Sequence, residues 1–390
     1  MNTALSCDIF CTVIDNFGDI GVSWRLAKQL ADEQQIKVRL WVDDLASFTK
    51  LCPAINVNLI EQTIGQIKVC HWSKDNDKIW QNIVIPDWVI EAFACKLPAA
   101  YLSAMALRQR PPLWINLEYL SAEKWVESSH LLPSPHPHLP LTKYFFFPGF
   151  TEQTGGLIIE NKLLAQRDDF QNNLAQQAAF WQALNIAPRQ PNEIRVSLFS
   201  YENPALENLL SIWENSAFSI RCLVPASKIL PQLSAYFGLP LTVGTIVQRG
   251  NLHVQILPFV EQADYDRLLW ACDINFVRGE DSCVRAQWAG KPFIWQIYPQ
   301  DDGVHLEKLR ALCQLWCADL PTEIANSVEK IWLAWNGQAD VADAWTRFIQ
   351  HKLTIENHAR IWAQQRASHN LALNLLDFWR QVGRIRAFKN

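Results

Sequence analysis

The chain contains the stretch Cys272-Asp273-Ile274-Asn275-Phe276-Val277-Arg278-Gly279-Glu280-Asp281-Ser282-Cys283-Val284-Arg285-Ala286-Gln287. It begins as an apolar, strand-like run and continues into a helical segment that we expect to end at Gly290, before Pro292. A cation, two carboxylates and a hydroxyl therefore lie where a strand ends and a helix begins. This junction is the usual ligand crevice of an open α/β sheet, and a helix N-terminus favours a phosphate.

Strand-like runs and helical segments alternate on both sides of this stretch. Short apolar runs rich in β-branched and aromatic residues predict strands at residues 9–14, 38–42, 67–71, 88–93, 113–117, 144–147, 194–199, 220–224, 254–257, 274–277 and 293–297. Helical spacing of apolar residues predicts helices at residues 22–34, 163–184 and 264–271, and a helical closing region at residues 332–388. Strand–helix alternation indicates parallel sheets covered by helices, which is the α/β class.

The length of 390 residues suggests two domains, and an apolar fraction of 49% can fill two cores. The segment Ala187-Pro188-Arg189-Gln190-Pro191-Asn192 is the best linker candidate, because it is short, polar and rich in proline. We therefore predict an N-terminal domain over residues 1–187 and a C-terminal domain over residues 188–361. The last helix, residues 362–390, is expected to pack back on the N-terminal domain.

The composition argues against several classes of protein. The 35 basic and 39 acidic side chains give a formal charge of -4 without a basic run, so we expect no nucleic-acid partner. The N-terminal residues do not resemble a signal peptide, and no apolar run approaches the roughly 18 residues that span a bilayer. We expect a cytoplasmic protein without a membrane segment. The ten dispersed cysteines indicate buried thiols, and Cys313 and Cys317 lack further ligands at zinc spacing.

A second loop of interest follows the first predicted strand. It reads Asp15-Asn16-Phe17-Gly18-Asp19-Ile20-Gly21, with two glycines that permit close backbone approach and two carboxylates that frame the turn. It is not a G-x-G-x-x-G loop, and its acidic residues would repel a phosphate. The loop therefore suits a cationic or hydroxyl-bearing acceptor. The alternative is that Asp15 and Asp19 only shape the turn and cap the helix.

Near the C-terminal loop, Arg278 could pair with a diphosphate and Ser282 could help to cradle it, while Glu280 would approach sugar hydroxyls. The alternative is that Asp281 or Ser282 caps the helix and Arg278 makes an ordinary ion pair. Two further candidates follow other strands. Phe259 and Gln262 could hold a base, and the alternative for Phe259 is packing in the core. Tyr201 offers a hydroxyl to a phosphate.

Several segments resemble one known family in order along nearly the whole chain. The N-terminal segment is Phe10-Cys11 followed by residues 15–27, and further matches are Trp41-Val42-Asp43-Asp44-Leu45, Glu91-Ala92-Phe93-Ala94-Cys95, Glu118-Tyr119-Leu120-Ser121-Ala122-Glu123, Pro133-Ser134-Pro135, Gly155-Gly156-Leu157-Ile158, Arg278-Gly279-Glu280-Asp281-Ser282 and Ile297-Tyr298-Pro299-Gln300-Asp301. Together they resemble the elongation factor P arginine rhamnosyltransferases (EarP). One departure is Cys283, where the family pattern has an aromatic residue.

The resemblance implies a GT-B glycosyltransferase, with two Rossmann-like domains facing across a cleft and no catalytic metal or other cofactor. It implies inverting transfer of L-rhamnose from dTDP-β-L-rhamnose to an arginine of translation elongation factor P, which activates that factor for relief of ribosome stalling. A monomer is also a family-level expectation. The N-terminal domain would be the acceptor side and the C-terminal domain would bind the nucleotide sugar.

The resemblance also assigns roles to residues. Asp19 would be the essential catalytic aspartate, Asp15 would support it, and Glu280 would be the second catalytic carboxylate. The remaining residues would contact dTDP-rhamnose: Asn16, Phe17 and Gly18 in the donor-facing loop, Phe259 and Gln262 at the nucleoside, and Tyr201, Arg278, Gly279, Asp281 and Ser282 at the diphosphate and sugar.

Two rival interpretations remain open at the level of sequence. One is a GT-B glycosyltransferase with a different nucleotide-sugar donor or acceptor. The other is a non-catalytic protein that binds elongation factor P or a nucleotide. The carboxylate pairs Asp15/Asp19 and Glu280/Asp281 argue against the second interpretation, because binding alone does not require them.

Overall fold

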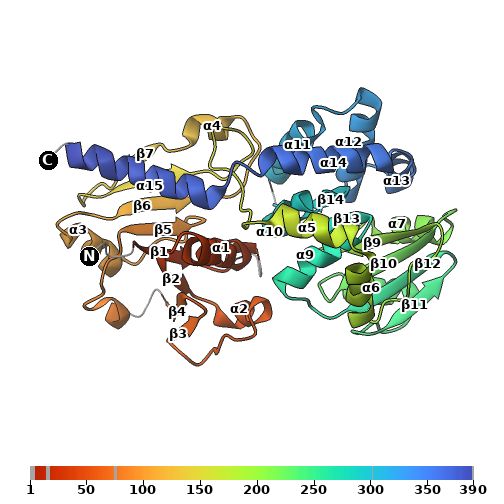
Figure 1. Cartoon of the computed structure of the whole chain (residues 1–390), viewed down its shortest axis with the longest axis horizontal. Helices are drawn as coiled ribbons and strands as arrows, with labels where there is room; N and C mark the ends of the chain where they lie inside the picture. Colours follow the sequence, from red (N-terminus) through yellow and green to blue (C-terminus); the bar gives the residue numbers. More distant parts are fainter. Residues whose placement is uncertain (1–4, 15–17, 74–76, 301, 389–390) are drawn as a thin grey trace. The chain divides into compact units, whose positions relative to one another are not determined.

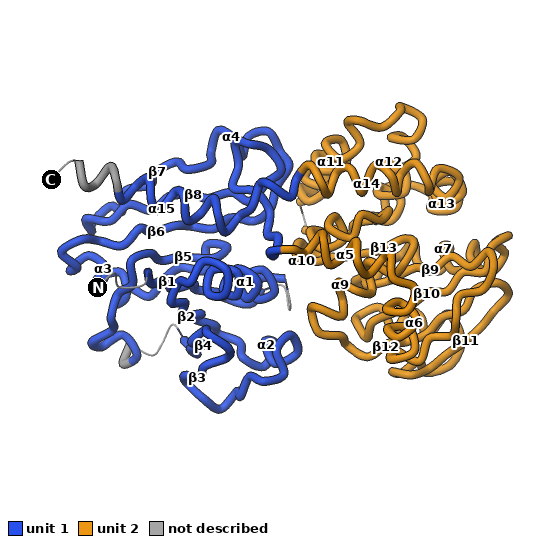
Figure 2. Tube along the Cα trace, in the orientation of Figure 1, with its two compact units in different colours: residues 1–161, 366–390 blue, residues 162–365 orange. Residues whose placement is uncertain are grey.

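All strands predicted from the sequence are present, and they form two mostly parallel sheets (Figure 1). The structure is a computed structural model that describes residues 5–14, 18–73, 77–300 and 302–388. Residues 1–161 with 366–390 form unit 1, and residues 162–365 form unit 2 (Figure 2). Each sheet belongs to one unit, and the α/β prediction is confirmed.

The sheet of unit 1 has the order β3-β4-β2-β1-β5-β6-β8-β7. Its elements are β1 (Ser6–Cys11), α1 (Gly18–Lys28), β2 (Lys37–Val42), α2 (Leu45–Leu51), β3 (Glu61–Ile64), β4 (Ile67–His71), β5 (Trp88–Ala92), α3 (Ala99–Leu107), β6 (Leu113–Leu117), α4 (Trp125–Ser129), β7 (Pro133–Pro135), β8 (Thr142–Phe146) and α15 (Leu371–Phe388). The short edge strands β3 and β7 pair antiparallel and were not predicted, because their side chains are largely polar or exposed.

Side chains of β1 alternate between the two faces of this sheet, as the pleat requires. Cys7, Ile9 and Cys11 pack in one core cluster with residues of α1 and α15. Phe10 faces the other way, where it stacks on Trp41 at 5.6 Å and meets Tyr101 edge-on at 4.8 Å. Because both faces are covered, the central strands are apolar throughout, which is why they were predictable.

The sheet of unit 2 has the order β11-β12-β10-β9-β13-β14, in which only β11 pairs antiparallel. Its elements are α5 (Leu163–Asn172), α6 (Leu174–Ala183), β9 (Glu193–Leu198), α7 (Leu206–Glu214), β10 (Ser219–Pro225), α8 (Leu230–Phe237), β11 (Ile246–Arg249), β12 (Leu252–Leu257), α9 (Gln262–Ala271), β13 (Ile274–Arg278), α10 (Gly279–Trp288), β14 (Phe293–Gln296), α11 (Val304–Cys317), α12 (Thr322–Trp335), α13 (Val341–Gln350) and α14 (Lys352–Arg366).

Two predicted helices differ from those in the structure. The stretch 163–184 is two helices, because Asn173 adopts an extended conformation and its side chain caps α6 by accepting the Gln176 N–H. The first helix begins at Gly18 rather than at residue 22 and continues past Lys28 as a π-helical turn. The helical closing region is present as α12 to α15.

The unit boundary lies near residue 161, whereas the sequence placed a domain boundary at residue 187. Helices α5 and α6 belong to unit 2, where the Arg167 guanidinium donates to the Trp288 carbonyl at 3.0 Å and Phe170 packs against Trp270 at 5.9 Å. The proline-containing segment 187–192 therefore lies inside unit 2. The chain returns to unit 1 through α15.

The cysteines are free thiols, and all ten except Cys52 are buried, as the sequence predicts. Among the residues that the structure describes, no helix combines the length and apolar character needed to cross a membrane. Within the same residues, no group of three or more His, Cys, Asp and Glu side chains is arranged to hold a metal ion.

Candidate active site

Asp19 lies at the carboxyl edge of the unit 1 sheet, in the first turn of α1, and is 2% exposed. The order of strands reverses direction between β1 and β5, so the end of β1 is a topological switch point, where open α/β sheets bind ligands. Asp19 Oδ2 accepts the Ile14 N–H at 2.8 Å, and Oδ1 accepts the Tyr119 hydroxyl at 3.2 Å. Asp19 therefore does shape the turn, but its carboxylate is also held in a fixed direction at a ligand-binding edge.

Tyr119 follows β6 and is itself supported from β5. Its ring stacks on Phe93 at 4.5 Å with an interplanar angle of 17°. Phe93 has φ 55, a left-handed conformation that is costly for a residue with a bulky side chain. The Phe93 N–H donates to the Leu117 carbonyl at 2.7 Å, and the next N–H, of Ala94, donates to Asn116 Oδ1 at 3.1 Å. These two hydrogen bonds offset the backbone strain at Phe93. They hold its ring where it stacks on Tyr119, whose hydroxyl contacts Asp19.

Three predicted residues of this loop, Asp15, Asn16 and Phe17, lie outside the described residues. Gly18 is the first residue of α1. On the side of unit 1, the structure therefore gives the position of Asp19 and adds Tyr119, which the sequence placed in a matching segment without a role.

In unit 2 the switch point lies between β9 and β13, which are neighbours. Arg278 ends β13, is 5% exposed, and its guanidinium lies 4.5 Å from the ring centres of both Phe199 and Tyr201. Both rings follow β9. Two aromatic faces hold a guanidinium by cation–π attraction and fix the orientation of its plane. A guanidinium in a fixed orientation is suited to bidentate hydrogen bonding with a phosphate. The predicted pair Arg278 and Tyr201 is therefore brought together, and Phe199 joins it.

The loop after β9 is anchored by Gln296, the last residue of β14. Gln296 Oε1 accepts the Tyr201 N–H at 2.9 Å and the Ser200 hydroxyl at 2.7 Å. The adjacent Trp295 indole donates to the Gly279 carbonyl at 2.8 Å. Gly279 has φ 62, a conformation that glycine adopts without steric cost, and it begins α10. Strand β14 thus supports both loops of the switch point.

The carboxylates of α10 point to different partners. Glu280 pairs with Lys308 of α11 at 2.6 Å, and both side chains are about one-fifth exposed. Asp281 instead accepts from Arg285 at 2.8 Å, and Arg285 also contacts Asp266 of α9 at 2.8 Å. Asp281 therefore joins an ion-pair network that fixes α10 against α9.

The predicted capping of α10 by Asp281 or Ser282 is wrong. The N-cap residue is Arg278, and no side chain caps it. Asp281 and Ser282 lie three and four positions after the N-cap residue, inside the helix, because α10 already begins at Gly279. Ser282 is buried, and its neighbour α9 contributes Tyr265, which packs edge-on to Phe199 at 5.6 Å. Burial raises the pKa of Tyr265, so the phenol near this cluster stays neutral.

The two nucleoside candidates follow β12. Phe259 is half-buried and Gln262 begins α9, the helix that carries Tyr265 and Asp266. Strand β12 is separated from β9 by β10 alone, so these residues lie along the same carboxyl edge as Tyr201. The extended placement suits a long ligand with a base at one end and a diphosphate at the other.

Several supporting residues were not found from the sequence. Phe199 is one of them. It lies two positions before the predicted Tyr201, and this alternation could have placed both rings on one side of the strand end. Gln296 is a polar residue at the end of an apolar strand, which is a weaker signal. The role of Lys308 could not be predicted from the sequence, because its ion pair with Glu280 depends on how α11 packs.

The chemistry of the two units is complementary. Unit 1 presents an oriented carboxylate, which can accept a proton from a cationic or hydroxyl-bearing group. Unit 2 presents a buried guanidinium and the first turn of a ten-residue helix, and groups of both kinds can stabilise a phosphate.

A model of the family described as Elongation-Factor P (EF-P) rhamnosyltransferase EarP matches residues 7–380. This chain belongs to the EarP family. The protein-arginine rhamnosyltransferase of Pseudomonas putida is 49% identical over 375 residues, covering 96% of this chain and 98% of that protein. The enzyme of the same name from Pseudomonas aeruginosa is 45% identical over 376 residues, with the same coverage of both chains.

Solved structures agree with this membership. The EarP chain from work on EarP-mediated arginine glycosylation of translation elongation factor EF-P is 37% identical, with a TM-score of 0.70 over 96% of this chain and 99% of that one. MurG of Acinetobacter baumannii has a TM-score of 0.51 at 11% identity, over 97% of this chain and all of that one, which shows the fold alone. This member of the EarP family therefore has the GT-B glycosyltransferase fold.

Proposed function

We propose that this protein transfers L-rhamnose from dTDP-β-L-rhamnose to one arginine side chain of translation elongation factor P, with inversion at the anomeric carbon. The observation that carries the proposal is the buried Asp19 carboxylate, held by Ile14 and Tyr119 at a sheet edge in a chain of the EarP family. The acceptor is taken from the family and from the names of the relatives. The donor follows from the resemblance in sequence.

Arginine is a demanding nucleophile, because its pKa exceeds about 12 and its charge is delocalised. In the proposed mechanism Asp19 orients one guanidinium N–H and concentrates the positive charge on the other nitrogens. The nitrogen attacks C1 of rhamnose as the bond from C1 to the diphosphate oxygen breaks. The proton passes to Asp19 and the bonding electrons leave with dTDP. Attack opposite the leaving group gives α-linked rhamnose.

The donor-side residues have matching roles. Arg278, with its plane set by Phe199 and Tyr201, neutralises charge on the departing diphosphate together with the first turn of α10. Glu280, directed by Lys308, is proposed to contact the sugar, and Phe259 and Gln262 the nucleoside. Gly18, Gly279, Asp281 and Ser282 would shape the donor site, and Asp15, Asn16 and Phe17 keep the roles that the resemblance implies.

The remaining proposals follow from the same family. The reaction requires no metal or cofactor in this scheme, because a guanidinium and a helix N-terminus take the place of a metal at the diphosphate. The protein is proposed to act as a monomer in the cytoplasm, where translation factors work.

Intact-mass spectrometry of elongation factor P tests the proposal. The factor is incubated with this protein and dTDP-β-L-rhamnose, beside an Asp19→Asn variant that retains the shape of the side chain. We expect one added deoxyhexose on arginine with the wild type and none with the variant. A shift with dTDP-glucose or on another acceptor would favour a different GT-B transferase. Binding of the factor without any transfer or donor hydrolysis would favour the non-catalytic alternative.

A further inference from the structure

The loop that follows β5 has an unusual backbone. Phe93, Ala94 and Lys96 have φ 55, 52 and 59, so three of four consecutive residues with side chains adopt a left-handed conformation that favours glycine. Such strain persists where the surrounding structure enforces it, and it is concentrated at functional sites. The loop lies at the carboxyl edge of the unit 1 sheet and includes the segment Glu91-Ala92-Phe93-Ala94-Cys95, which has no role in the mechanism proposed above.

Glu91, the second-last residue of β5, closes this loop. Its side chain is 2% exposed, and its Oε1 accepts the Lys96 N–H at 3.0 Å. Its Oε2 accepts the Trp114 indole N–H at 3.1 Å and pairs with the Lys143 ammonium at 3.3 Å. A buried carboxylate is costly unless donors surround it, so the contacts of both oxygens fix the side chain of Glu91. The fixed carboxylate in turn holds the end of the loop at Lys96.

Asn116 connects the loop with the segment that contains Tyr119. It lies in register with Glu91 on the next strand, β6, and is fully buried. Its Oδ1 accepts the Ala94 N–H at 3.1 Å, and its amide nitrogen donates to Glu118. The loop and the residue that precedes Tyr119 are therefore held by one side chain.

The tip of the loop contacts Tyr119 directly. The Phe93 ring stacks on the Tyr119 ring at 4.5 Å, and the Tyr119 hydroxyl donates to Asp19 at 3.2 Å. A continuous series of contacts thus begins at the buried Glu91 carboxylate and ends at the carboxylate proposed to accept the proton.

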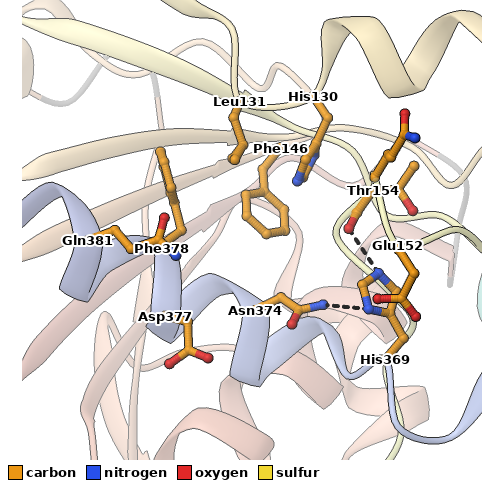
Figure 3. Close-up of a pocket in the computed structure, with 11 residues that line it drawn as sticks. His130, Leu131, Phe146, Glu152, Thr154, His369, Asn374, Asp377, Phe378 and Gln381 are labelled. Atoms are coloured by element: carbon orange, nitrogen blue, oxygen red, sulfur yellow. Dashed lines mark hydrogen bonds between the residues drawn. The ribbon is translucent and has the colours of Figure 1, made fainter.

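Strand β8 supports the same arrangement. The Glu118 N–H donates to the Phe146 carbonyl at 2.9 Å, and the Phe146 ring packs edge-on to His130 at 4.6 Å. Both rings lie in the wall of a pocket of about 480 Å³, and α15 forms its other wall (Figure 3). Lys143, the partner of Glu91, belongs to this strand as well. One strand therefore fixes both the Glu91 carboxylate and the segment that contains Tyr119.

We propose that Glu91 is a positioning residue of the transfer reaction. It holds the strained loop in the conformation that places Phe93 against Tyr119, and Tyr119 then keeps the Asp19 carboxylate in its direction. Glu91 is buried, so it acts through these residues and touches neither the sugar nor the acceptor. The inference rests on the proposed function for the reaction in which Asp19 takes part.

The test compares Glu91→Gln with a matched control, Asp8→Asn. Both substitutions replace a buried, ion-paired carboxylate of the same sheet by an amide of the same size, and Asp8 pairs with Arg39 at 2.6 Å near the amino end of β1. A glutamine has one acceptor oxygen in place of two, so it cannot serve both the Lys96 N–H and the Lys143 ammonium. Thermal melts verify that each variant is folded.

Initial rates with elongation factor P are measured for both variants, for Tyr119→Phe, and for Glu91→Gln combined with Tyr119→Phe. We expect Glu91→Gln to lower kcat about threefold to tenfold, because a misplaced hydroxyl makes a weaker hydrogen bond to Asp19. The acid limb of its pH–rate profile moves to higher pH, and its KM for dTDP-rhamnose is unchanged. In the combined variant Glu91→Gln should lower kcat no further than Tyr119→Phe alone, since both act through one contact.

The control separates positioning from stability. Asp8→Asn should lower the melting temperature and retain the kcat and the pH–rate profile of the wild type. An unchanged kcat in Glu91→Gln, or a loss that adds in full to that of Tyr119→Phe, overturns the inference. Glu91→Asp is the second variant, used if Glu91→Gln does not fold: it keeps the charge beside Lys143 but is one methylene too short to reach the Lys96 N–H as well, so the same loss of kcat is expected.

Hydrogen exchange gives a readout that does not depend on turnover. The amides of residues 93–96 should exchange faster in Glu91→Gln than in the wild type and at the wild-type rate in Asp8→Asn. If the wild-type protein transfers no sugar, the proposed function fails, and these exchange rates still decide whether Glu91 holds the loop. Exchange at the wild-type rate in Glu91→Gln contradicts the inference even where transfer is observed.

Discussion

The hydroxyl of Tyr119 donates a hydrogen bond to Asp19 at 3.2 Å, and the donor and the acceptor follow two different strands of the same sheet. The other Asp19 oxygen accepts the Ile14 N–H at 2.8 Å. A proton acceptor for arginine must keep its negative charge and its direction as the guanidinium approaches. Tyr119 contributes to both, and stacking on Phe93 limits the rotation of its ring.

Replacement of Tyr119 by phenylalanine removes this donor and retains the stacked ring. A hydrogen bond to a charged group contributes roughly 1.5–3 kcal/mol, so we expect kcat to fall about tenfold or more. The acid limb of the pH–rate profile moves to higher pH, because a carboxylate that has lost a donor holds a proton more tightly. The KM for dTDP-rhamnose stays unchanged. Tyr236→Phe, which removes a tyrosine hydroxyl from α8 in unit 2, serves as the control. If the pH–rate profile of Tyr119→Phe coincides with that of the wild type, Tyr119 has only a packing role.

We expect replacement of Arg278 by lysine, as well as by alanine, to weaken the binding of dTDP-rhamnose. The guanidinium lies 4.5 Å from two aromatic rings, and the ammonium of lysine has neither its flat face nor its paired donors. We expect both variants to bind dTDP-rhamnose at least about tenfold more weakly by calorimetry, since a charge-assisted contact contributes roughly 1.5–3 kcal/mol. Arg347→Ala removes an exposed cation of α13 and should leave the affinity unchanged. Full affinity in Arg278→Lys would contradict the role of the stacked guanidinium.

Gly279 offers a test of backbone conformation at the donor loop. A β-carbon at φ 62 costs about 1 kcal/mol, and Gly279 also supplies the carbonyl that accepts the Trp295 indole N–H. We expect Gly279→Ala to lower both the melting temperature and the affinity for dTDP-rhamnose. Gly244→Ala places the same strain at φ 87 in open space, so it should lower stability alone. Equal affinities in the two variants would show that the loop tolerates the change.

Much of the fold and part of the site follow from local sequence. Central strands such as β5 and β13 are buried on both faces, so their apolar runs are plain in the sequence. Polar residues follow β13 directly, at the carboxyl edge of its sheet. Edge strands such as β3 have no such pattern. The partners of the predicted residues depend on packing between distant elements. Tyr119 reaches Asp19 across 100 positions and Lys308 reaches Glu280 across 28, and no local rule relates them.

His130 predicts an acid-sensitive contribution to stability. Its pKa is lowered to about 4 in the folded protein by burial and by His369, whereas a histidine in the unfolded chain titrates near about 6.5. As the pH falls from about 6.5 towards about 4, the unfolded chain takes up the proton first and stability is lost, and above this range the residue has no effect. We expect His130→Asn, which retains an acceptor for the Phe147 N–H, to reduce the fall in melting temperature between about pH 7 and about pH 5. The exposed His138→Asn should behave as the wild type, and an undiminished fall in His130→Asn would contradict the assignment.

The place of α5 and α6 decides which fragment of the chain forms the whole of unit 2, the proposed donor-binding unit. Trp181 of α6 lies under the Arg195 guanidinium at 4.5 Å, and Arg195 pairs with the buried Glu193 at 2.6 Å in β9. At the other end of the unit, the Trp362 indole donates to Gln287 Oε1 at 2.8 Å. These contacts cover one end of the sheet and the buried face of α10.

A fragment of residues 162–365 is therefore expected to fold alone, to unfold cooperatively and to bind dTDP-rhamnose. A fragment of residues 188–361 lacks α5, α6 and Trp362, so it exposes Arg195 and Trp270 and leaves the buried charge of Glu193 less shielded. We expect this shorter fragment to melt at a lower temperature and without a sharp transition, because a buried ion pair that loses its cover is strongly destabilising. Circular dichroism melts and calorimetry with the nucleotide sugar compare the two. If the two fragments unfold with equal cooperativity and bind the nucleotide sugar with equal affinity, the boundary of the binding unit lies near residue 187, as the proline-containing segment predicts.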